Sequence, residues 1–335
     1  MKYAVLLGDG MADWAVDSLG GKTPLASARI PNMDRIAREG TLGLIDTVPR
    51  GLKPGSDVAI LSVLGYDPLS CYTGRGPLEA ASMGVQLDPG DLAFRCNLVT
   101  LDDGPDLVMA DFTADHISSD EAREILLELD RRLGTSTLKF YPGVGYRHLL
   151  VWKGGGPDVE TTPPHDITGQ PTTGYLPKGK GAQDVIDVML RSREVLRGHP
   201  VNRRRAGAGK KEATSVWLWG QGGKPAMEPL SEKYGLRGGM ISAVDLLNGL
   251  AVYAGLEILR VEGATGYIDT NFAGKAEKAL EALERKDFVF VHVEAPDEMG
   301  HEGNAPGKVK AIEDFDGKVV GPVLEGIARY GEHRV

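Results

Sequence analysis

Four residues of this sequence have side chains that suit metal-assisted phosphoryl transfer: Asp9, Ser56, Asp297 and His301. Aspartate oxygens and histidine nitrogens are common ligands of Mn²⁺, Mg²⁺ and Zn²⁺. Asp297 and His301 are four residues apart, so one face of a helical turn would present both. A serine hydroxyl beside such ions is acidified and becomes a nucleophile. The combination predicts a metal site around a serine that accepts a phosphoryl group.

The same residues stand where a parallel sheet would gather them. Asp9 follows the apolar run 3–7, and residues 297–301 follow the apolar run 288–293. Ser56 follows a third apolar run and its Pro/Gly loop. Ligands of open parallel sheets bind beyond the carboxyl ends of the strands, so we expect the three clusters to meet in one cleft. A helix capped by Ser56 would also offer free N–H groups to a phosphoryl group. Taken singly, Asp9 is more typical of a turn and Ser56 of a structural cap, whereas the spacing of Asp297 and His301 favours neither a structural nor a metal-binding role.

Apolar runs and helix signals alternate at both ends of the chain. Residues 3–7 read as a buried strand that ends in a tight turn, and Pro31 and Gly40 bracket a helix at about 30–39. With a second strand predicted at 42–48, the chain opens strand–helix–strand, which is typical of a parallel α/β sheet. After residue 215 the same alternation returns. There we predict strands at 215–219, 257–261 and 288–293 and helices at 242–254, 275–285 and 309–329.

The middle of the chain has a different texture. A hairpin is predicted within residues 98–109, around an Asp-Asp-Gly turn. A helix is predicted at 119–133, with Ser119 as its cap, and another at 184–196. The basic run at 201–211 reads either as a solvated loop or as an anion-binding patch.

Length and composition are those of an ordinary globular protein of two domains. At about 150 residues per domain, 335 residues suggest two. The simplest arrangement is one α/β domain, formed by residues 1–72 and 215–335, that is split by an inserted domain at 73–214. Hydrophobic residues make up 41% of the chain and charged residues 25%, which leaves ample material for a core.

Composition also argues against several classes of protein. No apolar run reaches the ~18 residues of a membrane helix, and the N-terminus carries no signal peptide. A net charge of −9 argues against nucleic acid as a partner, because phosphate backbones attract clustered Lys and Arg. Cys71 and Cys96 form neither a metal-type spacing nor a disulfide framework. We therefore expect a cytoplasmic protein, with neither nucleic acid nor membrane as a partner.

Several segments resemble the cofactor-independent phosphoglycerate mutases, specifically their archaeal-type branch, within the alkaline phosphatase superfamily. The central ones are residues 54–59 (PGSDVA), which include Ser56, and residues 294–303 (EAPDEMGHEG), which include Asp297 and His301. Further matching segments lie at 7–13, 21–25, 31–34, 61–68, 72–79, 94–99, 161–166 and 217–222. They are distributed from the N-terminus to near the end, so the resemblance covers the whole chain.

The resemblance implies an alkaline-phosphatase-like three-layer domain with a mostly parallel sheet, split by a smaller α/β domain that binds glycerate. The family interconverts 3-phosphoglycerate and 2-phosphoglycerate through a phosphoserine intermediate, without a bisphosphoglycerate cofactor. It uses two divalent metal ions, here Mn²⁺, Mg²⁺ or Zn²⁺. Asp9 and Ser56 match ligands of one ion, Asp297 and His301 match ligands of the other, and Ser56 matches the nucleophile. Water must be excluded during transfer, because it would hydrolyse the intermediate.

The substrate of this family carries a carboxylate and a phosphate, for which Arg and His are the natural partners. His116 resembles a glycerate-side histidine. Arg147, His165 and Asp166 lie in motifs typical of the family's inserted domain, and Arg95 is a further candidate. For each of these residues, a satisfied polar role in a loop-rich domain is the structural alternative.

One expected feature of the family is missing from the sequence. The metal site of the family also uses an Asp-His pair and a further His, after one more strand. Val335 reads as the start of that strand and ends the sequence, and His333 lies outside the motif. The expectation is therefore a truncated chain that lacks the C-terminal part of the core. The alternative to truncation is a site-deficient relative that only binds. A separate alternative to the mutase function is a phosphotransferase of the same fold and metals that acts on another small hydroxy compound, such as homoserine.

Overall fold

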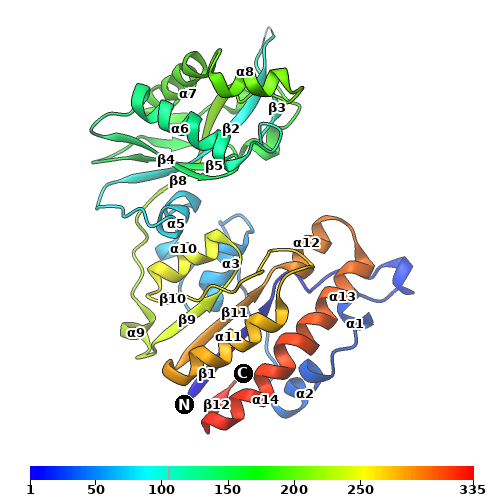
Figure 1. Cartoon of the computed structure of the whole chain (residues 1–335). Helices are drawn as coiled ribbons and strands as arrows, with labels where there is room; N and C mark the ends of the chain where they lie inside the picture. Colours follow the sequence, from blue (N-terminus) through cyan, green and yellow to red (C-terminus); the bar gives the residue numbers. More distant parts are fainter. Residues whose placement is uncertain (105) are drawn as a thin grey trace. The chain divides into compact units, whose positions relative to one another are not determined.

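The computed structural model describes residues 1–104 and 106–335, and their contacts divide the chain into two compact units (Figure 1). Unit 1 consists of Met1–Leu69 and Met227–Val335, and unit 2 consists of Ser70–Ala226. Unit 2 is thus an insertion in unit 1. The predicted insertion, 73–214, ends too early, because strand β8 (Ser215–Gly223) pairs with a strand of unit 2.

The sheet of unit 1 is parallel, with the strand order β10-β9-β11-β1-β12. The strands are β1 (Lys2–Gly8), β9 (Gly238–Ile241), β10 (Glu257–Ile258), β11 (Phe288–Val293) and β12 (His333–Arg334). The strand predicted at 288–293 is confirmed as β11, which is buried at every residue. Because side chains alternate along a strand, Val289, Val291 and Val293 pack into one hydrophobic cluster, while Phe290 and His292 point to the opposite face.

Helices cover both faces of this sheet (Figure 1). On one face lie α11 (Phe272–Arg285), α13 (Ala305–Phe315) and α14 (Gly321–Ile327), and on the other lie α3 (Ser56–Val63) and α10 (Asp245–Tyr253). The helix predicted at 309–329 begins earlier, and a π-helical segment at Asp316–Val320 interrupts it. The other α-helices of this unit among the described residues are α1 (Pro24–Ser27), α2 (Pro31–Glu39), α9 (Leu230–Lys233) and α12 (Ala295–His301). Within the described residues, no helix is long and apolar enough to cross a membrane.

The strand predicted at 42–48 does not form, and this prediction is wrong. Leu42, Leu44 and Ile45 lie in a loop with exposed fractions of 78%, 104% and 67%. The two neighbours of β1 are β11 and β12, both from the C-terminal end of the chain. Seven apolar-rich residues cannot indicate by themselves whether a partner strand is available, and here the places beside β1 are filled from elsewhere.

Unit 2 is built on an antiparallel sheet in the order β3-β2-β5-β4, with β8 also paired to β2. Its strands are β2 (Leu92–Asp102), β3 (Val108–Asp111), β4 (Leu138–Val144) and β5 (Arg147–Trp152), with β6 (Asp158–Glu160) and β7 (Lys178–Lys180) as a separate pair. Its helices are α5 (Arg75–Ser82), α6 (Ser119–Leu133), α7 (Ala182–Leu196) and α8 (Pro200–Gly207), and α4 (Pro68–Cys71) lies at the junction of the units. The hairpin predicted within 98–109 and the helices at 119–133 and 184–196 are confirmed.

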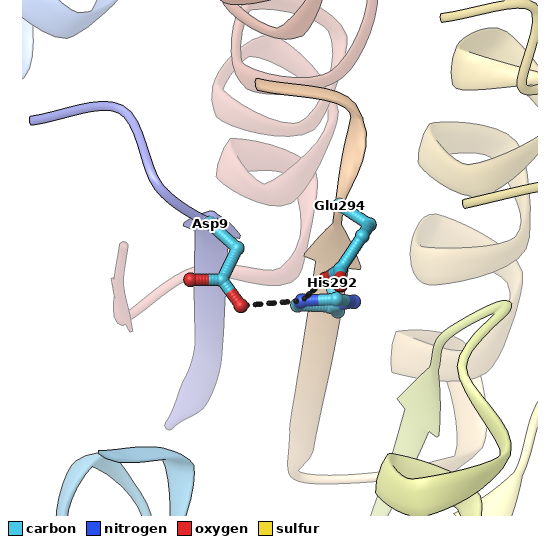
Figure 2. Close-up of side chains that lie close together, drawn as sticks. All are labelled: Asp9, His292 and Glu294. Atoms are coloured by element: carbon cyan, nitrogen blue, oxygen red, sulfur yellow. Dashed lines mark hydrogen bonds and ion pairs between the residues drawn. The ribbon is translucent and has the colours of Figure 1, made fainter. Parts of the chain in front are cut away.

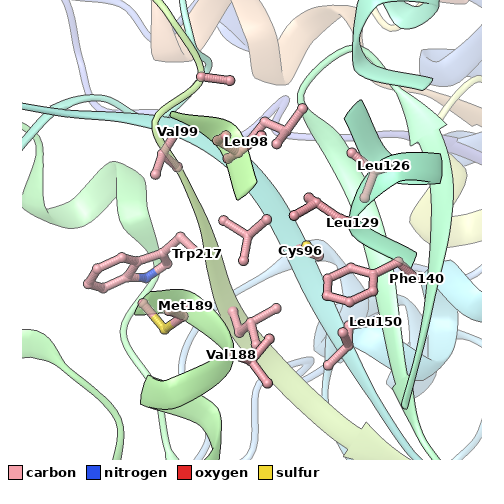
Figure 3. Close-up of a cluster of buried hydrophobic side chains, with 14 of the residues drawn as sticks. Cys96, Leu98, Val99, Leu126, Leu129, Phe140, Leu150, Val188, Met189 and Trp217 are labelled. Carbon is pink, nitrogen blue, oxygen red and sulfur yellow. The ribbon is translucent and has the colours of Figure 1, made fainter. Parts of the chain in front are cut away.

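The two faces of the unit 2 sheet have different partners. Phe94, Cys96 and Leu98 of β2 pack with α6 and α7 in the main core (Figure 3). Ala93 directly precedes Phe94 on the strand, so its side chain points to the opposite face, where it packs with Ala80 of α5. Residue 95 therefore lies on the α5 face, by the alternation of the strand. Cys71 and Cys96 are buried and form no disulfide among the described residues, and burial raises the pKa of the Cys96 thiol.

Two local predictions in unit 2 are corrected by the structure. The cap of α6 is Ser118 rather than Ser119, because the Ser118 hydroxyl and the Glu121 carboxylate form a reciprocal capping box. The basic run at 201–211 is not a solvated loop. Its first part is helix α8, which begins at Pro200, and the Arg205 side chain on it is only 1% exposed. Proline suits the first position of a helix, which is the local signal for this start.

Candidate active site

The carboxyl ends of β1 and β11 bring three metal-type ligands together (Figure 2). The two strands are parallel neighbours with Gly8 opposite Val293, and the Asp9 N–H donates to the Val293 carbonyl at 2.9 Å. His292 Nε2 lies 3.2 Å from Asp9 Oδ2 and 3.0 Å from Glu294 Oε2. One ligand atom of each of the three residues lies within 4.8 Å of the others. Strand pairing alone therefore places residues 9, 292 and 294 at one point.

Charge in this group is set by a competition between burial and hydrogen bonding. Burial opposes ionisation of Asp9, but hydrogen bonds from His292 and Ser56 and the charge of His292 outweigh it and lower the pKa of Asp9. Burial also disfavours a charged His292, yet hydrogen bonds and attraction from Asp9 and Glu294 outweigh it and raise its pKa. On its other side, His292 Nδ1 lies 3.2 Å from Ser242 Oγ. His292 Nε2 therefore lies close to both carboxylates, and their negative charge favours the protonated form of its ring.

This donor set fits a divalent cation. Two carboxylates and one imidazole are typical ligands of Zn²⁺ and Mn²⁺. Glu294 Oε2 is buried and, although it lies 3.0 Å from His292 Nε2, it makes no well-directed hydrogen bond within the described residues. That oxygen has acceptor capacity left for a cation. Because a histidine nitrogen must be deprotonated to bind a metal, a cation at this place would compete with protonation of His292.

Asp297 and His301 lie on one face of α12, as their spacing predicted. His301 Nε2 is 3.1 Å from Asp297 Oδ2. Asp297 passes so close to Gly10 that a Cβ at residue 10 would be 2.6 Å from the Asp297 Cα, and Gly10 also has a φ of +64°. Only glycine fits at this contact. Burial and repulsion from Glu294 raise the pKa of Asp297.

Ser56 is the first residue of α3, and its hydroxyl hydrogen-bonds to Asp9. The prediction that Ser56 caps the helix is wrong. Gly55 occupies the cap position, and no side chain caps the helix there. The serine hydroxyl is thus engaged with Asp9 rather than with its own helix.

The structure therefore groups the four predicted residues Asp9, Ser56, Asp297 and His301 around the ends of β1 and β11. Sequence reasoning missed two neighbours, His292 and Glu294. Their signal was available: a histidine inside an otherwise apolar strand, followed by an acid at the strand end.

Unit 2 holds a second cluster, which is rich in arginine. Arg95 of β2 lies on the α5 face, with its Nη2 2.8 Å from Glu79 Oε1 and its guanidinium 4.3 Å from the Trp219 ring centre. Burial lowers the pKa of Arg95, Glu79 opposes this, and the nearby charges of Arg75 and Arg147 lower it further. Three arginines thus concentrate positive charge at one place, which favours an anion.

His165 and Asp166 belong to the same cluster. The His165 ring packs edge-on against Trp219 at 5.3 Å and Phe112 at 6.0 Å between ring centres, and its Nε2 lies 3.5 Å from Asp166 Oδ1. Burial lowers the pKa of His165, and the nearby arginines add to this against the attraction of Asp166. Arg95, Arg147, His165 and Asp166 are therefore brought together. Arg75 and Trp219 were missed, although both lie in the matching segments at 72–79 and 217–222.

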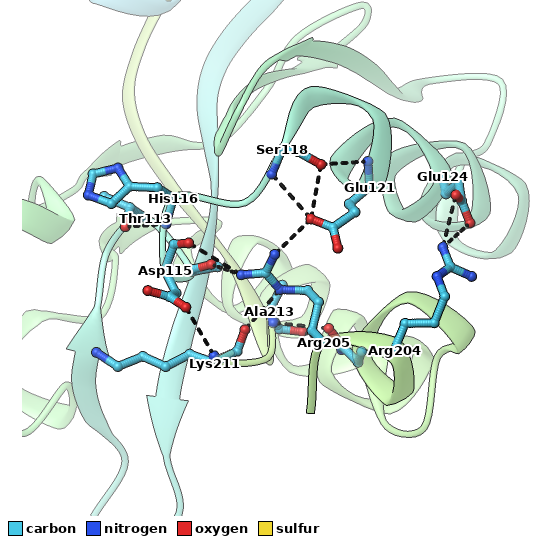
Figure 4. A network of polar contacts seen from close by, with 12 residues as sticks. Thr113, Asp115, His116, Ser118, Glu121, Glu124, Arg204, Arg205, Lys211 and Ala213 are labelled. Carbon is cyan, nitrogen blue, oxygen red and sulfur yellow. Dashed lines mark hydrogen bonds and ion pairs between the residues drawn. The ribbon is translucent and has the colours of Figure 1, made fainter. Parts of the chain in front are cut away.

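His116, the remaining substrate candidate, lies on the turn between β3 and α6 (Figure 4). Phe112 at the start of this turn contacts His165, so the turn adjoins the arginine-rich cluster. Ala114, Asp115 and His116 have φ values of 47°, 54° and 47°, in the left-handed region. That conformation costs roughly 1–2 kcal/mol for each residue other than glycine. The exposed His116 is thus presented by a strained backbone.

Comparison with known proteins gives a consistent result. A family model described as 2,3-bisphosphoglycerate-independent phosphoglycerate mutase matches residues 37–202. A probable 2,3-bisphosphoglycerate-independent phosphoglycerate mutase of Geobacter sulfurreducens is 57% identical over 338 residues, which cover 100% of this chain and 84% of the relative. A protein of the same name from Methanosarcina barkeri is 56% identical over 326 residues, which cover 97% of this chain and 81% of that protein.

Two solved structures resemble the whole chain. A Pyrococcus horikoshii protein aligns with a TM-score of 0.79 and 31% sequence identity. The alignment covers 97% of this chain and 78% of the Pyrococcus chain. The cofactor-independent phosphoglycerate mutase of Thermoplasma acidophilum aligns with a TM-score of 0.65 and 28% sequence identity. The alignment covers 98% of this chain and 85% of the Thermoplasma chain.

Proposed function

The chain belongs to the 2,3-bisphosphoglycerate-independent phosphoglycerate mutase family, and from this premise we propose how its side chains carry out the reaction. Its function is the interconversion of 3-phosphoglycerate and 2-phosphoglycerate, without a bisphosphoglycerate cofactor. One observation carries the proposed mechanism: the Ser56 hydroxyl hydrogen-bonds to Asp9, which contacts His292 beside Glu294.

In the proposed reaction, Ser56 is the nucleophile. Its Oγ attacks phosphorus, the bond from phosphorus to the glycerate oxygen breaks, and that oxygen takes up the proton released by the serine. Return of the phosphoryl group to the other glycerate hydroxyl regenerates the free serine. Asp9 accepts the hydrogen bond of the hydroxyl, and so orients Oγ for attack.

The proposed metal ligands share the carboxyl ends of β1 and β11 and are Asp9, Ser56, His292, Glu294, Asp297 and His301. Asp9, His292 and Glu294 would hold one divalent ion, and Asp297 and His301 would contribute to a second. Bound Mn²⁺, Mg²⁺ or Zn²⁺ supplies positive charge that acidifies the serine hydroxyl and stabilises the phosphoryl oxygens.

In this scheme unit 1 is an alkaline-phosphatase-like domain, and unit 2 is the substrate domain. The charge gathered by Arg95 and Arg147 supports binding of the glycerate carboxylate there, because guanidinium groups pair with carboxylates in a two-point geometry. His165, oriented by Asp166, and His116 supply further hydrogen bonds to the glycerate.

The test is turnover by the full-length protein. With Mn²⁺ present, the protein should convert 3-phosphoglycerate to 2-phosphoglycerate. The product is measured by adding enolase as a coupling enzyme. Ser56→Ala should abolish both turnover and trapped phosphoserine. Ser62→Ala is a matched control on the same helix, because its hydroxyl donates to the Thr47 carbonyl instead. Full activity in Ser56→Ala would exclude Ser56 as the nucleophile. No turnover with any divalent metal would exclude phosphoglycerate mutase activity.

A further inference from the structure

The left-handed turn that carries His116 is held by a buried arginine from another helix. We propose that Arg205 is a positioning residue, which keeps residues 114–116 left-handed and thereby sets the place of the His116 imidazole. The inference rests on the proposed substrate-binding role of His116. Arg205 lies in the basic run at 201–211. Its side chain contacts none of the predicted site residues directly, and we infer that it acts on His116 through the backbone of this turn.

The conformation of the turn requires outside support. Three successive residues other than glycine have φ near +50°, and Ala114 has no polar side chain that would ease this conformation. Strained backbone persists only where its surroundings fix it, and it gathers at functional sites. Something must therefore hold these three residues against relaxation.

Arg205 provides that support from the carbonyl side (Figure 4). Its Nη2 donates to the Ala114 carbonyl at 2.6 Å and to the Asp115 carbonyl at 3.4 Å. Its Nη1 is 2.7 Å from Glu121 Oε2 and its Nε donates to the Lys211 carbonyl at 2.9 Å, so the guanidinium itself is fixed. The side chain is only 1% exposed. A planar fork of donors is needed for these simultaneous contacts, and lysine cannot supply it.

The amide side of the turn is held by Asp111. Its carboxylate accepts from the Thr113 N–H and hydroxyl at 2.8 and 2.7 Å and from the Asp115 N–H at 3.3 Å, and Lys211 Nζ lies 3.1 Å away. The Thr113 hydroxyl in turn accepts from the His116 N–H at 3.0 Å. The N–H groups of Asp115 and His116 are thus bound to Asp111 and Thr113, and the carbonyls of Ala114 and Asp115 are bound to Arg205.

The turn delivers an exposed histidine beside the arginine-rich cluster. Phe112 packs against His165, and four residues later the chain presents the His116 ring to solvent. Relaxation of the backbone at 114–116 would redirect that ring, while α6 and the sheet would stay in place through their own core contacts. Loss of Arg205 should therefore affect substrate use more than it affects the fold.

The experiment compares Arg205→Lys with Arg204→Lys. Arg204 is the preceding residue of α8, but it is 55% exposed and pairs with Glu124, so it is a matched control. We expect Arg205→Lys to lower kcat/KM at least tenfold and Arg204→Lys to change it less than twofold. In a His116→Gln background, Arg205→Lys should have no further effect, because both changes remove the same interaction. Effects that multiply would overturn the proposal.

Two more measurements separate this inference from the proposed function. Amide hydrogen exchange at residues 115 and 116 should speed up in Arg205→Lys and not in Arg204→Lys, and unchanged exchange would refute the positioning role whatever the protein catalyses. Adding Ala114→Gly to Arg205→Lys should restore part of kcat/KM, since glycine adopts φ near +47° without strain. If Arg205→Lys does not fold, Asp111→Asn tests the same turn from its amide side, with the same non-additivity toward His116→Gln expected.

Discussion

A buried histidine makes the hairpin that carries Arg147 sensitive to acid. His148 on β5 is 1% exposed, and its Nδ1 accepts the Gly143 N–H at 2.9 Å across the β4–β5 turn. Burial lowers the pKa of His148 to about 3. The folded protein thus keeps this imidazole neutral over a pH range in which the unfolded chain protonates it.

The expected effect follows from proton linkage. An unfolded histidine titrates near pH 6.5, so between pH 6.5 and about 3 the unfolded chain binds a proton that the folded chain does not. The free energy of unfolding therefore falls as the pH falls through this window, by about 1.4 kcal/mol per pH unit. The loss reaches about 2 kcal/mol at pH 5 and about 4 kcal/mol near pH 3.

His148→Gln isolates this contribution, because an amide oxygen can accept the Gly143 N–H and does not titrate. Denaturant unfolding can be followed by tryptophan fluorescence, since Trp152, Trp217 and Trp219 all lie in unit 2. Between pH 7 and pH 5, the wild type should lose about 2 kcal/mol relative to the variant. The carboxylates titrate alike in both proteins and cancel. A difference independent of pH, or an NMR titration that places the His148 pKa near 6.5, would refute the reasoning.

Three substitutions test the two clusters. Asp9→Asn should weaken Mn²⁺ binding more than tenfold by calorimetry, and unchanged affinity would remove Asp9 from the ligands. Glu79→Leu leaves the Arg95 guanidinium buried without its carboxylate and should lower the free energy of unfolding by about 3–5 kcal/mol, most of which a second change, Arg95→Met, should restore. Gly10→Ala should abolish activity, because its Cβ would meet α12 at 2.5–2.7 Å. Gly20→Ala has a similar φ of +67° but open space around it, so it should keep full activity.

Local sequence was sufficient for the parts of the fold that depend on neighbours in the chain. The strand at 288–293, the amphipathic helix at 119–133 and the hairpin within 98–109 all formed as predicted, although the cap of the helix is Ser118 and not Ser119. Strand alternation and helix periodicity are local properties of the sequence. The expectation that Asp9 and residues 297–301 lie together also needed only one general rule. Parallel strands present their carboxyl ends at the same edge of a sheet.

What the sequence could not determine was which segments become partners. Residues 42–48 are apolar enough for a strand, yet β1 pairs with β11, and Asp9 meets a histidine 283 positions away. In the same way, β8 joined unit 2 and Arg205 was drawn from a basic run into the support of a strained turn. Local patterns state which face of an element is apolar and what its ends require. Only the tertiary structure determines which distant segment packs against that face or binds those ends. The free energy of such a non-local contact depends on all other segments that could pack at the same position.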